Sequence, residues 1–330
     1  MPTKTSTKAS VLKALKENAG GFLSGEELSN SLDISRTAVW KAIKTLREEG
    51  YVIKAVTNRG YMLVQSDSSI TEDSLRTLLP PQYRSNKIFI YDTLDSTNSQ
   101  AKRIALENAE HGTIVMALQQ TGGRGRLGRS FFSPKSGIYL SVIVKPTFDL
   151  SQSVLVTSAA AVAVAEAVEA VCGKNAQIKW VNDVYLDGKK ICGILTEGIT
   201  DFETGRIESL VIGIGVNTTV EGFPKELLDT VGAVEGDYSR SALAAEIISR
   251  TLHFAETIED RTFIPSYKEK SMVLGKTIKV YKGGYPSGGP NGPAGIPARA
   301  LSIDDDGGLV VLYSDGSRET LSTGEISVRL

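Results

Sequence analysis

The stretch GTIVMALQQTGGRGRLGRSFFSPKSGIYLSVIVKP, residues 112–146, sets the architecture of the central part of this chain. Its two ends, 112–120 and 137–146, are rich in β-branched and aliphatic residues and predict strands. Between them, residues 119–132 alternate glycines with arginines in a pattern that suits neither a helix nor a strand. The sequence therefore predicts a structureless loop that leaves one strand and returns into the next at the rim of a sheet.

Three interpretations of this glycine–arginine loop follow from its residues. Arg124 and Arg126 are two positions apart, so in an extended segment their side chains point the same way and can grip a phosphate or a carboxylate. The glycines let the backbone approach a ligand and let the loop open and close. A flexible linker explains the glycines but not the repeated arginines. A nucleic-acid arm and a lid over a small anion explain both equally well.

The chain around the loop alternates strands with helices. We expect strands at 87–94, 112–120, 137–146, 176–199 and 209–217, and helices at 97–109, 154–172 and 239–258. Asp187 and Gly188 predict a hairpin turn inside the fourth of these segments. Hairpin strands with helices packed on one side indicate an α+β mixed sheet. No Walker A motif and no nicotinamide-type glycine fingerprint follows the appropriate strand.

Composition limits the class of protein. A net charge of −1 over 330 residues, with 41% hydrophobic and 23% charged residues, is ordinary for a soluble globular protein. Two cysteines and two histidines argue against a disulfide framework or a metal centre, so we expect no metal site. The amino terminus lacks the apolar core of a signal peptide, and the apolar run 154–172 contains Glu166 and Glu169, which favours a buried helix. We therefore expect a cytoplasmic protein that does not contact a membrane.

Residues 1–65 predict a winged helix-turn-helix that binds DNA. They hold ten lysines and arginines against six carboxylates, on an otherwise acidic chain. Ser24 and Glu27 form a capping box, and a second helix is expected from the N-cap Ser35 to Gly50. The helix-turn-helix spans Gly25 to Lys44, and a β-hairpin wing follows around Asn58 and Arg59. The outward face of the second helix carries Arg36, Thr37, Trp40, Lys41 and Lys44. The alternative is a small helical interaction domain with solvated lysines.

Two further polar segments point to a small-molecule site. Ser96, Thr97 and Asn98 stand where a strand is expected to meet a helix, so they either cap that helix or hold a neutral polar ligand such as a urea. Lys179 lies in an otherwise apolar strand, where an ammonium without a partner would be costly to bury. It either forms a structural ion pair with Asp183 or Glu197, or it faces a pocket and meets a ligand anion.

The end of the chain alternates apolar and polar residues and predicts a small β-barrel. Turns are expected at Asp306–Gly307 and Asp315–Gly316. A glycine- and proline-rich insertion at 282–298 interrupts this part. The expected domains are a winged helix at 1–65, a linker at 66–82, a catalytic domain at 83–272 and a C-terminal domain at 273–330.

Together these motifs resemble the biotin protein ligases, specifically the bifunctional type that is also the biotin-operon repressor. The resemblance covers essentially the whole chain. It rests on DSTN at 95–98, GRGRLGR at 123–129, KWVND at 179–183, GILTE at 193–197, IGIGVN at 212–217 and the winged helix. It implies an SH3-like C-terminal barrel, and an enzyme that condenses biotin with ATP to biotinyl-5′-AMP and then passes biotin to a lysine of a biotin carboxyl carrier protein.

The resemblance also implies roles for individual residues. Ser96, Thr97, Asn98 and Gln120 would contact biotin, and Arg124, Gly125 and Arg126 would form the loop that closes over it. Lys179 would sit beside the carboxylate and the α-phosphate, with Mg²⁺ carried on the triphosphate. Further ligand contacts are expected at Gly123, Arg129, Phe131, Asn182, Gly193 and Asn217. Val181 stands where proline is usual, and Phe131 where tryptophan often follows the loop.

As a regulator, the resemblance implies a homodimer that forms with biotinyl-5′-AMP as corepressor and holds two winged helices on palindromic operator DNA. Two other functions remain open on the sequence. One is a transcription factor that senses a ligand without catalysis, and the other is a lipoate-type ligase of the same fold.

Overall fold

The computed structural model describes residues 7–18, 21–48, 53–57, 59–63, 70–146, 153–200, 203, 206–281, 295–322 and 325–328. The chain divides into two compact units. The first comprises Met1–Thr71 and Asp237–Ala242, and the second comprises Glu72–Gly236 and Leu243–Leu330. Each unit is described by itself.

The amino-terminal unit is the predicted winged helix-turn-helix. Its elements are α1 (Thr7–Glu17), α2 (Gly25–Leu32), α3 (Arg36–Glu48), β1 (Ile53–Val56) and β2 (Gly60–Leu63). The capping box is confirmed, because Glu27 N donates to Ser24 Oγ over 3.0 Å and Ser24 N donates to Glu27 Oε2 over 2.7 Å. Apolar side chains from all five elements form one buried cluster that fixes α3 against the rest of the unit. Gly50 and Asn58 lie outside the described residues.

The second unit begins inside the segment expected to be a linker. Helix α4 (Glu72–Leu78) and the short 3₁₀ turn η1 (Pro81–Tyr83) occupy most of residues 72–83. Leu75 and Leu79 are fully buried. This part of the expected linker is therefore packed against the second unit, whereas residues 66–69 lie outside the described ranges.

A seven-stranded mixed sheet forms the centre of the second unit. Its order is β3 (Ile88–Leu94), β4 (Thr113–Gln120), β5 (Ile138–Val144), β9 (Ile207–Val216), β8 (Lys189–Thr200), β7 (Asp183–Leu186) and β6 (Gln177–Lys179). Only β3 and β4, which α5 (Thr97–Leu106) connects, run parallel. Asp187 and Gly188 join β7 to β8 with φ values of 51° and 76°, the turn that an Asp-Gly pair predicts.

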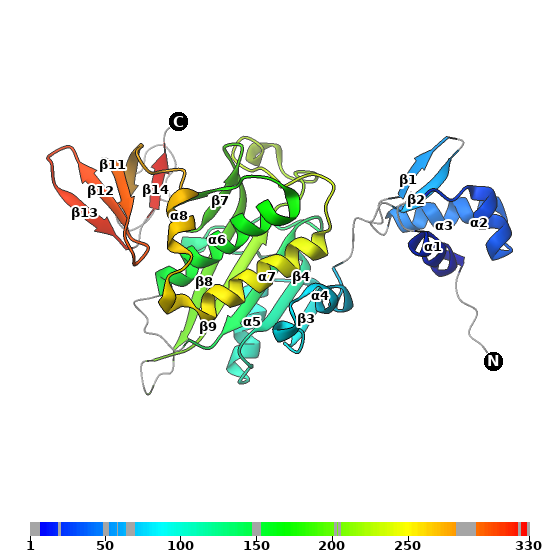
Figure 1. Cartoon of the computed structure of the whole chain (residues 1–330), viewed down its shortest axis with the longest axis horizontal. Helices are drawn as coiled ribbons and strands as arrows, with labels where there is room; N and C mark the ends of the chain where they lie inside the picture. Colours follow the sequence, from blue (N-terminus) through cyan, green and yellow to red (C-terminus); the bar gives the residue numbers. More distant parts are fainter. Residues whose placement is uncertain are drawn as a thin grey trace. The chain divides into compact units, whose positions relative to one another are not determined.

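Helices α6 (Ser153–Cys172), α7 (Arg240–Glu256) and α8 (Ile264–Glu269) lie on one face of this sheet, but the helix expected at 97–109 packs on the other face, so the prediction of helices on one side is only partly confirmed. In Figure 1, α6 and α7 lie side by side in front of the strands. Thr157 of α6 bonds to Thr196 of β8 over 2.8 Å, and Arg250 of α7 pairs with Glu166 of α6. Helix α8 also contacts α6. The apolar segment Val154–Cys172 is long enough to cross a membrane, but 67% of it is buried here, so it is a core helix.

The opposite face of the sheet is only partly covered. Ala101 and Ala105 of α5 pack there against Val115, Ile143 and Val211. Because neighbouring strand residues in register point to the same face, Ser141, Gly213 and Leu195 also lie on this side. The area beyond the amino-terminal end of α5 is left open, and the candidate site lies there.

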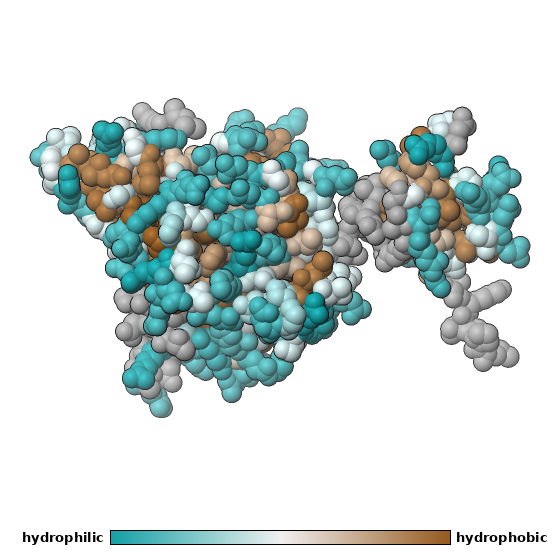
Figure 2. Space-filling view, viewed as in Figure 1, coloured by the Kyte–Doolittle hydropathy of each residue, from teal (hydrophilic) through white to brown (hydrophobic). Residues whose placement is uncertain are grey.

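The C-terminal part is an antiparallel β domain, as predicted. Its strands are β10 (Thr277–Tyr281), β11 (Ile296–Ile303), β12 (Leu309–Tyr313), β13 (Arg318–Leu321) and β14 (Glu325–Val328), in the order β13-β12-β11-β10-β14. Of the expected insertion, residues 282–294 lie outside the described ranges, and 296–298 are the paired start of β11. Figure 2 shows apolar residues gathered over these strands, whereas the outer face of α6 and α7 is largely hydrophilic.

The C-terminal domain is joined to the sheet through the KWVND segment. Trp180 Nε1 donates to the carbonyl of Gly307 over 3.0 Å in a buried position. Arg261 and Asp306 form an ion pair of 2.6 Å beside it. The turn between β11 and β12 is thus held directly against the segment that contains Lys179.

Candidate active site

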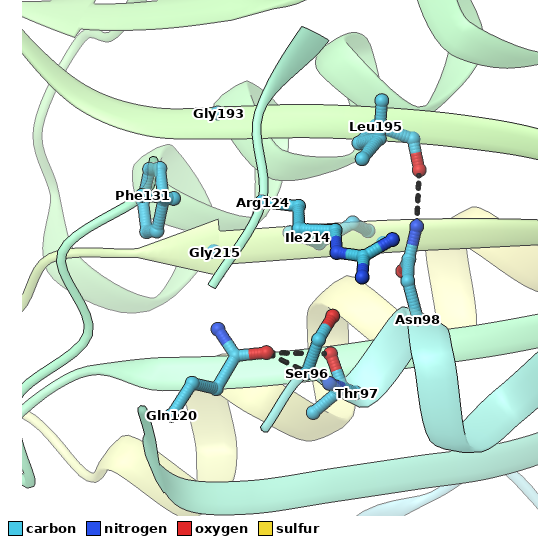
Figure 3. A pocket seen from close by; sticks show the side chains of 11 residues that line it. Ser96, Thr97, Asn98, Gln120, Arg124, Phe131, Gly193, Leu195, Ile214 and Gly215 are labelled. Carbon is cyan, nitrogen blue, oxygen red and sulfur yellow. Dashed lines mark hydrogen bonds between the residues drawn. The ribbon is translucent and has the colours of Figure 1, made fainter. Parts of the chain in front are cut away.

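A cavity on the open face of the sheet begins at the amino-terminal end of α5. Figure 3 shows Ser96, Thr97 and Asn98 at this helix end, with Gln120 and Arg124 beside them. Phe131 closes another side, and residues of β8 and β9 line the rest, namely Gly193, Leu195, Gly213, Ile214 and Gly215. The structure therefore brings together five side chains that the sequence analysis assigned to one ligand, and we call this space the first cavity.

Glycines in β8 and β9 make the first cavity possible. A Cβ on Gly213 would stand 2.0 Å from Asn98 Oδ1, and a Cβ on Gly215 would stand 2.5 Å from Phe131 Cε1. Gly193 is paired with Gly215 and lies under the same ring, with 3.1 Å from its Cβ position to Phe131 Cε2. The IGIGVN and GILTE motifs thus remove side chains where α5 and the loop must approach the sheet closely.

Hydrogen bonds hold Gln120 and the start of α5 in place. Ser96 is the N-cap of α5, while Thr97 donates to Gln120 Oε1 from its backbone N over 2.8 Å and from Oγ1 over 3.2 Å. Gln120 Nε2 donates in turn to Ser133 Oγ over 2.9 Å, and Ser133 Oγ donates to the carbonyl of Phe131. The capping interpretation of the DSTN segment is confirmed at Ser96, which also lines the cavity.

The glycine–arginine loop is ordered, and the prediction of a structureless segment is wrong. Gln120 pairs with Ser133, and Arg124 with Ser130, in antiparallel bridges. The tip is η2 (Arg126–Gly128), where Leu127 and Gly128 have φ values of 57° and 74°. The loop folds back as a narrow hairpin because backbone groups of the glycines and arginines pair with each other. It forms one wall of the cavity.

A second cavity adjoins the first and is rich in cations. Arg124, Phe131, Gly193 and Leu195 line both cavities, so the two are continuous. The second cavity is also lined by Gly125, Arg126, Arg129, Ser130, Asn182, Asp183, Lys190 and Ile194. Four cationic side chains against the single carboxylate give this lining a net positive charge, which favours anions.

The arginines of the second cavity differ in their surroundings. Arg126 donates to Asn182 Oδ1 over 3.3 Å, and burial lowers the pKa of its guanidinium, with nearby Arg129 acting in the same direction. Arg124 has no hydrogen-bond or ion-pair partner among the described residues. In Figure 3 its guanidinium points toward Asn98, and its charge also acts on Glu197. Its five N–H donors are of the kind that binds an anionic group.

Lys179 lies at the edge of the site and lines neither cavity. It pairs in register with Asp183, which pairs with Gly193, so all three lie on the same face of the sheet. Its Nζ stands 5.9 Å from the centre of the Tyr185 ring. Asp183 forms a 2.6 Å ion pair with Lys190, a cation that the sequence analysis did not single out.

Two other expected ligand contacts, Gly123 and Asn217, lie outside the lining of both cavities. Gly123 stands at the base of the hairpin, where a Cβ would lie 2.4 Å from the carbonyl of Phe131. Asn217 is buried outside both cavities and donates to the carbonyl of Gly232 over 3.1 Å. No cluster of histidine, cysteine and carboxylate side chains that could hold a metal ion occurs in the described ranges.

The winged helix presents the surface expected to meet DNA. Arg36, Thr37, Trp40, Lys41 and Lys44 are all exposed on α3. Lys44 Nζ lies 5.9 Å from the centre of the Trp40 ring, and Trp40 is 55% exposed. Arg36 pairs with Glu26 over 2.6 Å at the surface. In the wing, Arg59 lies over the ring of Phe22.

Three parts of the chain match known protein families. Residues 90–217 match the Biotin/lipoate A/B protein ligase family, residues 7–62 match an HTH domain, and residues 296–329 match the Biotin protein ligase C terminal domain. The chain is 34% identical to the Bifunctional ligase/repressor BirA of Bacillus subtilis, over 97% of this chain and 98% of that protein. It is 28% identical to the protein of the same name from Escherichia coli, over 99% and 98%.

A solved structure shares the fold of the second unit. The biotin protein ligase from Aquifex aeolicus, in complex with biotin and ATP, superposes with a TM-score of 0.60 at 26% identity. The match covers 74% of this chain and 98% of that one.

Proposed function

This chain belongs to the family of bifunctional biotin ligases and repressors, and we propose on that premise how its two cavities divide the ligase reaction. The first cavity binds the fused rings of biotin through Ser96, Thr97, Asn98 and Gln120. The second cavity binds the phosphates of ATP through Arg124, Arg126, Arg129 and Lys190. Biotin then lies with its carboxylate directed from the first cavity into the second.

The observation that supports this division most directly is the position of Arg124. It lines both cavities and has no hydrogen-bond or ion-pair partner in the described part of the chain. In the proposed division, the carboxylate of biotin and the α-phosphate of ATP meet at the junction of the two cavities, and Arg124 supplies a cation there. The two anions repel each other, so a cation between them lowers the energy of their approach.

The chemistry needs no nucleophile from the protein. The biotin carboxylate attacks the α-phosphorus, the bond to pyrophosphate breaks, and biotinyl-5′-AMP forms. The amine of an acceptor lysine on a biotin carboxyl carrier protein then attacks the acyl carbon, and AMP leaves. Arg124, Arg126 and Lys190 stabilise the charge that develops on phosphate oxygens, and the hairpin excludes water from the mixed anhydride. Lys179, on the same sheet face, approaches the carboxylate from the side of β6.

Mg²⁺ would be carried on the triphosphate of ATP, with Asp183 as the carboxylate that the lining of the second cavity offers it. Asp183 already pairs with Lys190. A single paired carboxylate suits an ion that is held mainly by phosphates and water. Mg²⁺ supplies charge neutralisation on the triphosphate, while the arginines orient the nucleotide.

The winged helix adds the second activity. We propose that α3 reads operator DNA in the major groove with Arg36, Trp40 and Lys41, while the wing around Arg59 contacts the backbone. Biotinyl-5′-AMP acts as corepressor by favouring a homodimer, which places two winged helices on a palindromic site.

Biotin-dependent exchange of labelled pyrophosphate into ATP tests the ligase assignment. We expect exchange with biotin and none with lipoate. Exchange with lipoate would indicate the lipoate-type ligase, and DNA binding that responds to biotin without any exchange would indicate a sensor that lacks catalysis. Chelation of Mg²⁺ should abolish exchange in the wild-type protein.

A further inference from the structure

The side chain of Asn98, which lines the first cavity, makes three hydrogen bonds within the protein. Its Nδ2 donates to Glu197 Oε2 over 2.8 Å and to the carbonyl of Leu195 over 3.1 Å. Its Oδ1 accepts from Ser141 Oγ over 2.7 Å. Asn98 is 4% exposed and Ser141 is completely buried. Both N–H groups of the amide are therefore used inside the protein.

These partners also fix which way the amide faces. If the amide were turned over, Oδ1 would meet a carboxylate and a carbonyl, and Nδ2 would meet the oxygen that now bonds to Oδ1. Two acceptor–acceptor contacts in a buried place would cost more than any bond gained. In Figure 3, Nδ2 points to Leu195. Oδ1 lies against Gly213, which lines the first cavity, since a Cβ at Gly213 would stand 2.0 Å from this oxygen. Asn98 thus offers the cavity one acceptor lone pair and no donor.

Glu197 is the charged partner among those that fix this orientation. It lies on β8 two positions after Leu195, on the same face of the sheet, and Lys102 holds its other oxygen over 2.6 Å. Lys102 is one turn after Asn98 on α5, so both residues reach the carboxylate from the same side of the helix. Burial opposes ionisation of Glu197, but the hydrogen bonds from Lys102 and Asn98 outweigh it, and its pKa lies below the usual range. The carboxylate accepts from Asn98 throughout the neutral range.

We propose that Glu197 is a positioning residue that, through Asn98, makes the first cavity select ligands with an N–H donor at this point. This inference rests on the proposed function, in which the donor is an N–H of the ureido ring of biotin. Glu197 does not touch the ligand itself. Its effect is to keep Asn98 Oδ1 directed at the ligand, and to keep the Asn98 N–H groups away from it.

An isosteric pair of variants tests this inference. In Glu197→Gln the new carbonyl oxygen is attracted to the Lys102 ammonium, so its NH₂ faces the NH₂ of Asn98 and the amide loses its fixed orientation. We expect KM for biotin in the pyrophosphate exchange assay to rise about tenfold, with kcat and KM for ATP within about twofold of wild type. In the double variant Lys102→Met with Glu197→Gln, nothing attracts that oxygen away from Asn98. We expect KM for biotin to return to within about threefold of wild type.

A matched control and a ligand probe complete the test. Glu110 forms an exposed 2.9 Å pair with Lys87, so Glu110→Gln removes a similar ion pair away from the site and should leave KM for biotin unchanged. Biotin methylated on one ureido nitrogen lacks one N–H. One of the two mono-methylated isomers carries its methyl group on the nitrogen that faces Asn98. The affinity ratio between biotin and this isomer should be smaller in Glu197→Gln than in wild type.

The outcomes separate this inference from the proposed function. If wild-type protein shows no biotin-dependent exchange, the proposed function is wrong. If wild type exchanges but Glu197→Gln matches Glu110→Gln, or the double variant is no better than the single one, Glu197 has no positioning role. Equal changes in kcat and in both KM values would also overturn it, since a general packing defect would produce them.

Discussion

The ring of Phe131 lies directly over the backbone of Gly215, so close that a Cβ at Gly215 would stand 2.5 Å from the ring's Cε1. Phe131 is the last loop residue that lines the cavities, and Gly215 belongs to the central strand β9. The edge of the buried Tyr139 ring meets Phe131 from the side, with 6.4 Å between ring centres. The hairpin that forms one wall of the site therefore packs against the sheet at Gly215.

Gly215→Ala should damage biotin binding. The added methyl group forces the Phe131 ring into the first cavity or lifts the hairpin, and overpacking of this kind costs about 1–3 kcal/mol. We expect KM for biotin to rise by about tenfold or more. Gly198→Ala is the matched control, because its Cβ would meet the nearest atom, Leu210 Cδ2, at an ordinary 3.7 Å. Equal KM values for the two variants in the exchange assay would mean that Phe131 does not shape the biotin pocket.

Arg126→Gln should slow adenylate formation more than it weakens biotin binding. Arg126 lines the second cavity, where it donates to Asn182, and does not line the first. Removal of one preorganised donor to a developing anion typically lowers kcat by about 100-fold. Single-turnover formation of biotinyl-5′-AMP and equilibrium binding of biotin measure the two effects separately. Arg299→Gln, an exposed arginine on β11, is the control. A loss of biotin affinity with normal adenylation would reverse the assignment of the cavities.

The sequence predicted the strands and helices of the second unit because their periodicity is strong. Residues 137–146 are rich in β-branched and aliphatic residues, which favours a strand, and the Asp187–Gly188 turn has a specific backbone requirement. The hairpin form of the loop could not be predicted, since its pairs, such as Arg124 with Ser130, are backbone contacts that leave no side-chain pattern. Motif resemblance located Arg124 and Phe131 without revealing that the loop is folded.

Other parts of the site depend on tertiary contacts that no local pattern records. Glu197 and Asn98 are 99 residues apart and meet because Gly213, on the strand between β5 and β8, has no side chain. Lys190 reaches Asp183 because a register shift between Val184 and Tyr185 changes the pairing of β7 with β8. Alternating glycines at 213 and 215 were the available signal for a close approach to the sheet, and strand periodicity places both on one face.

Trp180→Phe should lower both stability and catalysis, because Trp180 joins the C-terminal domain to the segment that contains Lys179. The substitution removes the indole N–H and leaves the buried carbonyl of Gly307 without its hydrogen bond, which costs about 1–3 kcal/mol. We expect a lower thermal midpoint and a lower kcat for adenylation, because Trp180 lies between Lys179 and Asn182. Trp40→Phe, at the other tryptophan, is exposed and should change neither quantity. A lower midpoint with unchanged kcat would show that this contact serves stability alone.

Lys41→Ala should weaken operator binding and leave adenylation intact. Lys41 is exposed on α3, so its loss removes a phosphate contact and should reduce the slope of log affinity against log salt by about one. Lys13→Ala removes the same charge from α1, where Lys13 is 77% exposed and 3.8 Å from Glu17, and should leave that slope unchanged. Binding to a labelled operator over a range of salt concentrations measures both. If the two variants lose the same affinity, DNA binding depends on the net charge of the unit rather than on α3. If Lys41→Ala also lowers pyrophosphate exchange, the two activities are not divided between the two units in the way proposed.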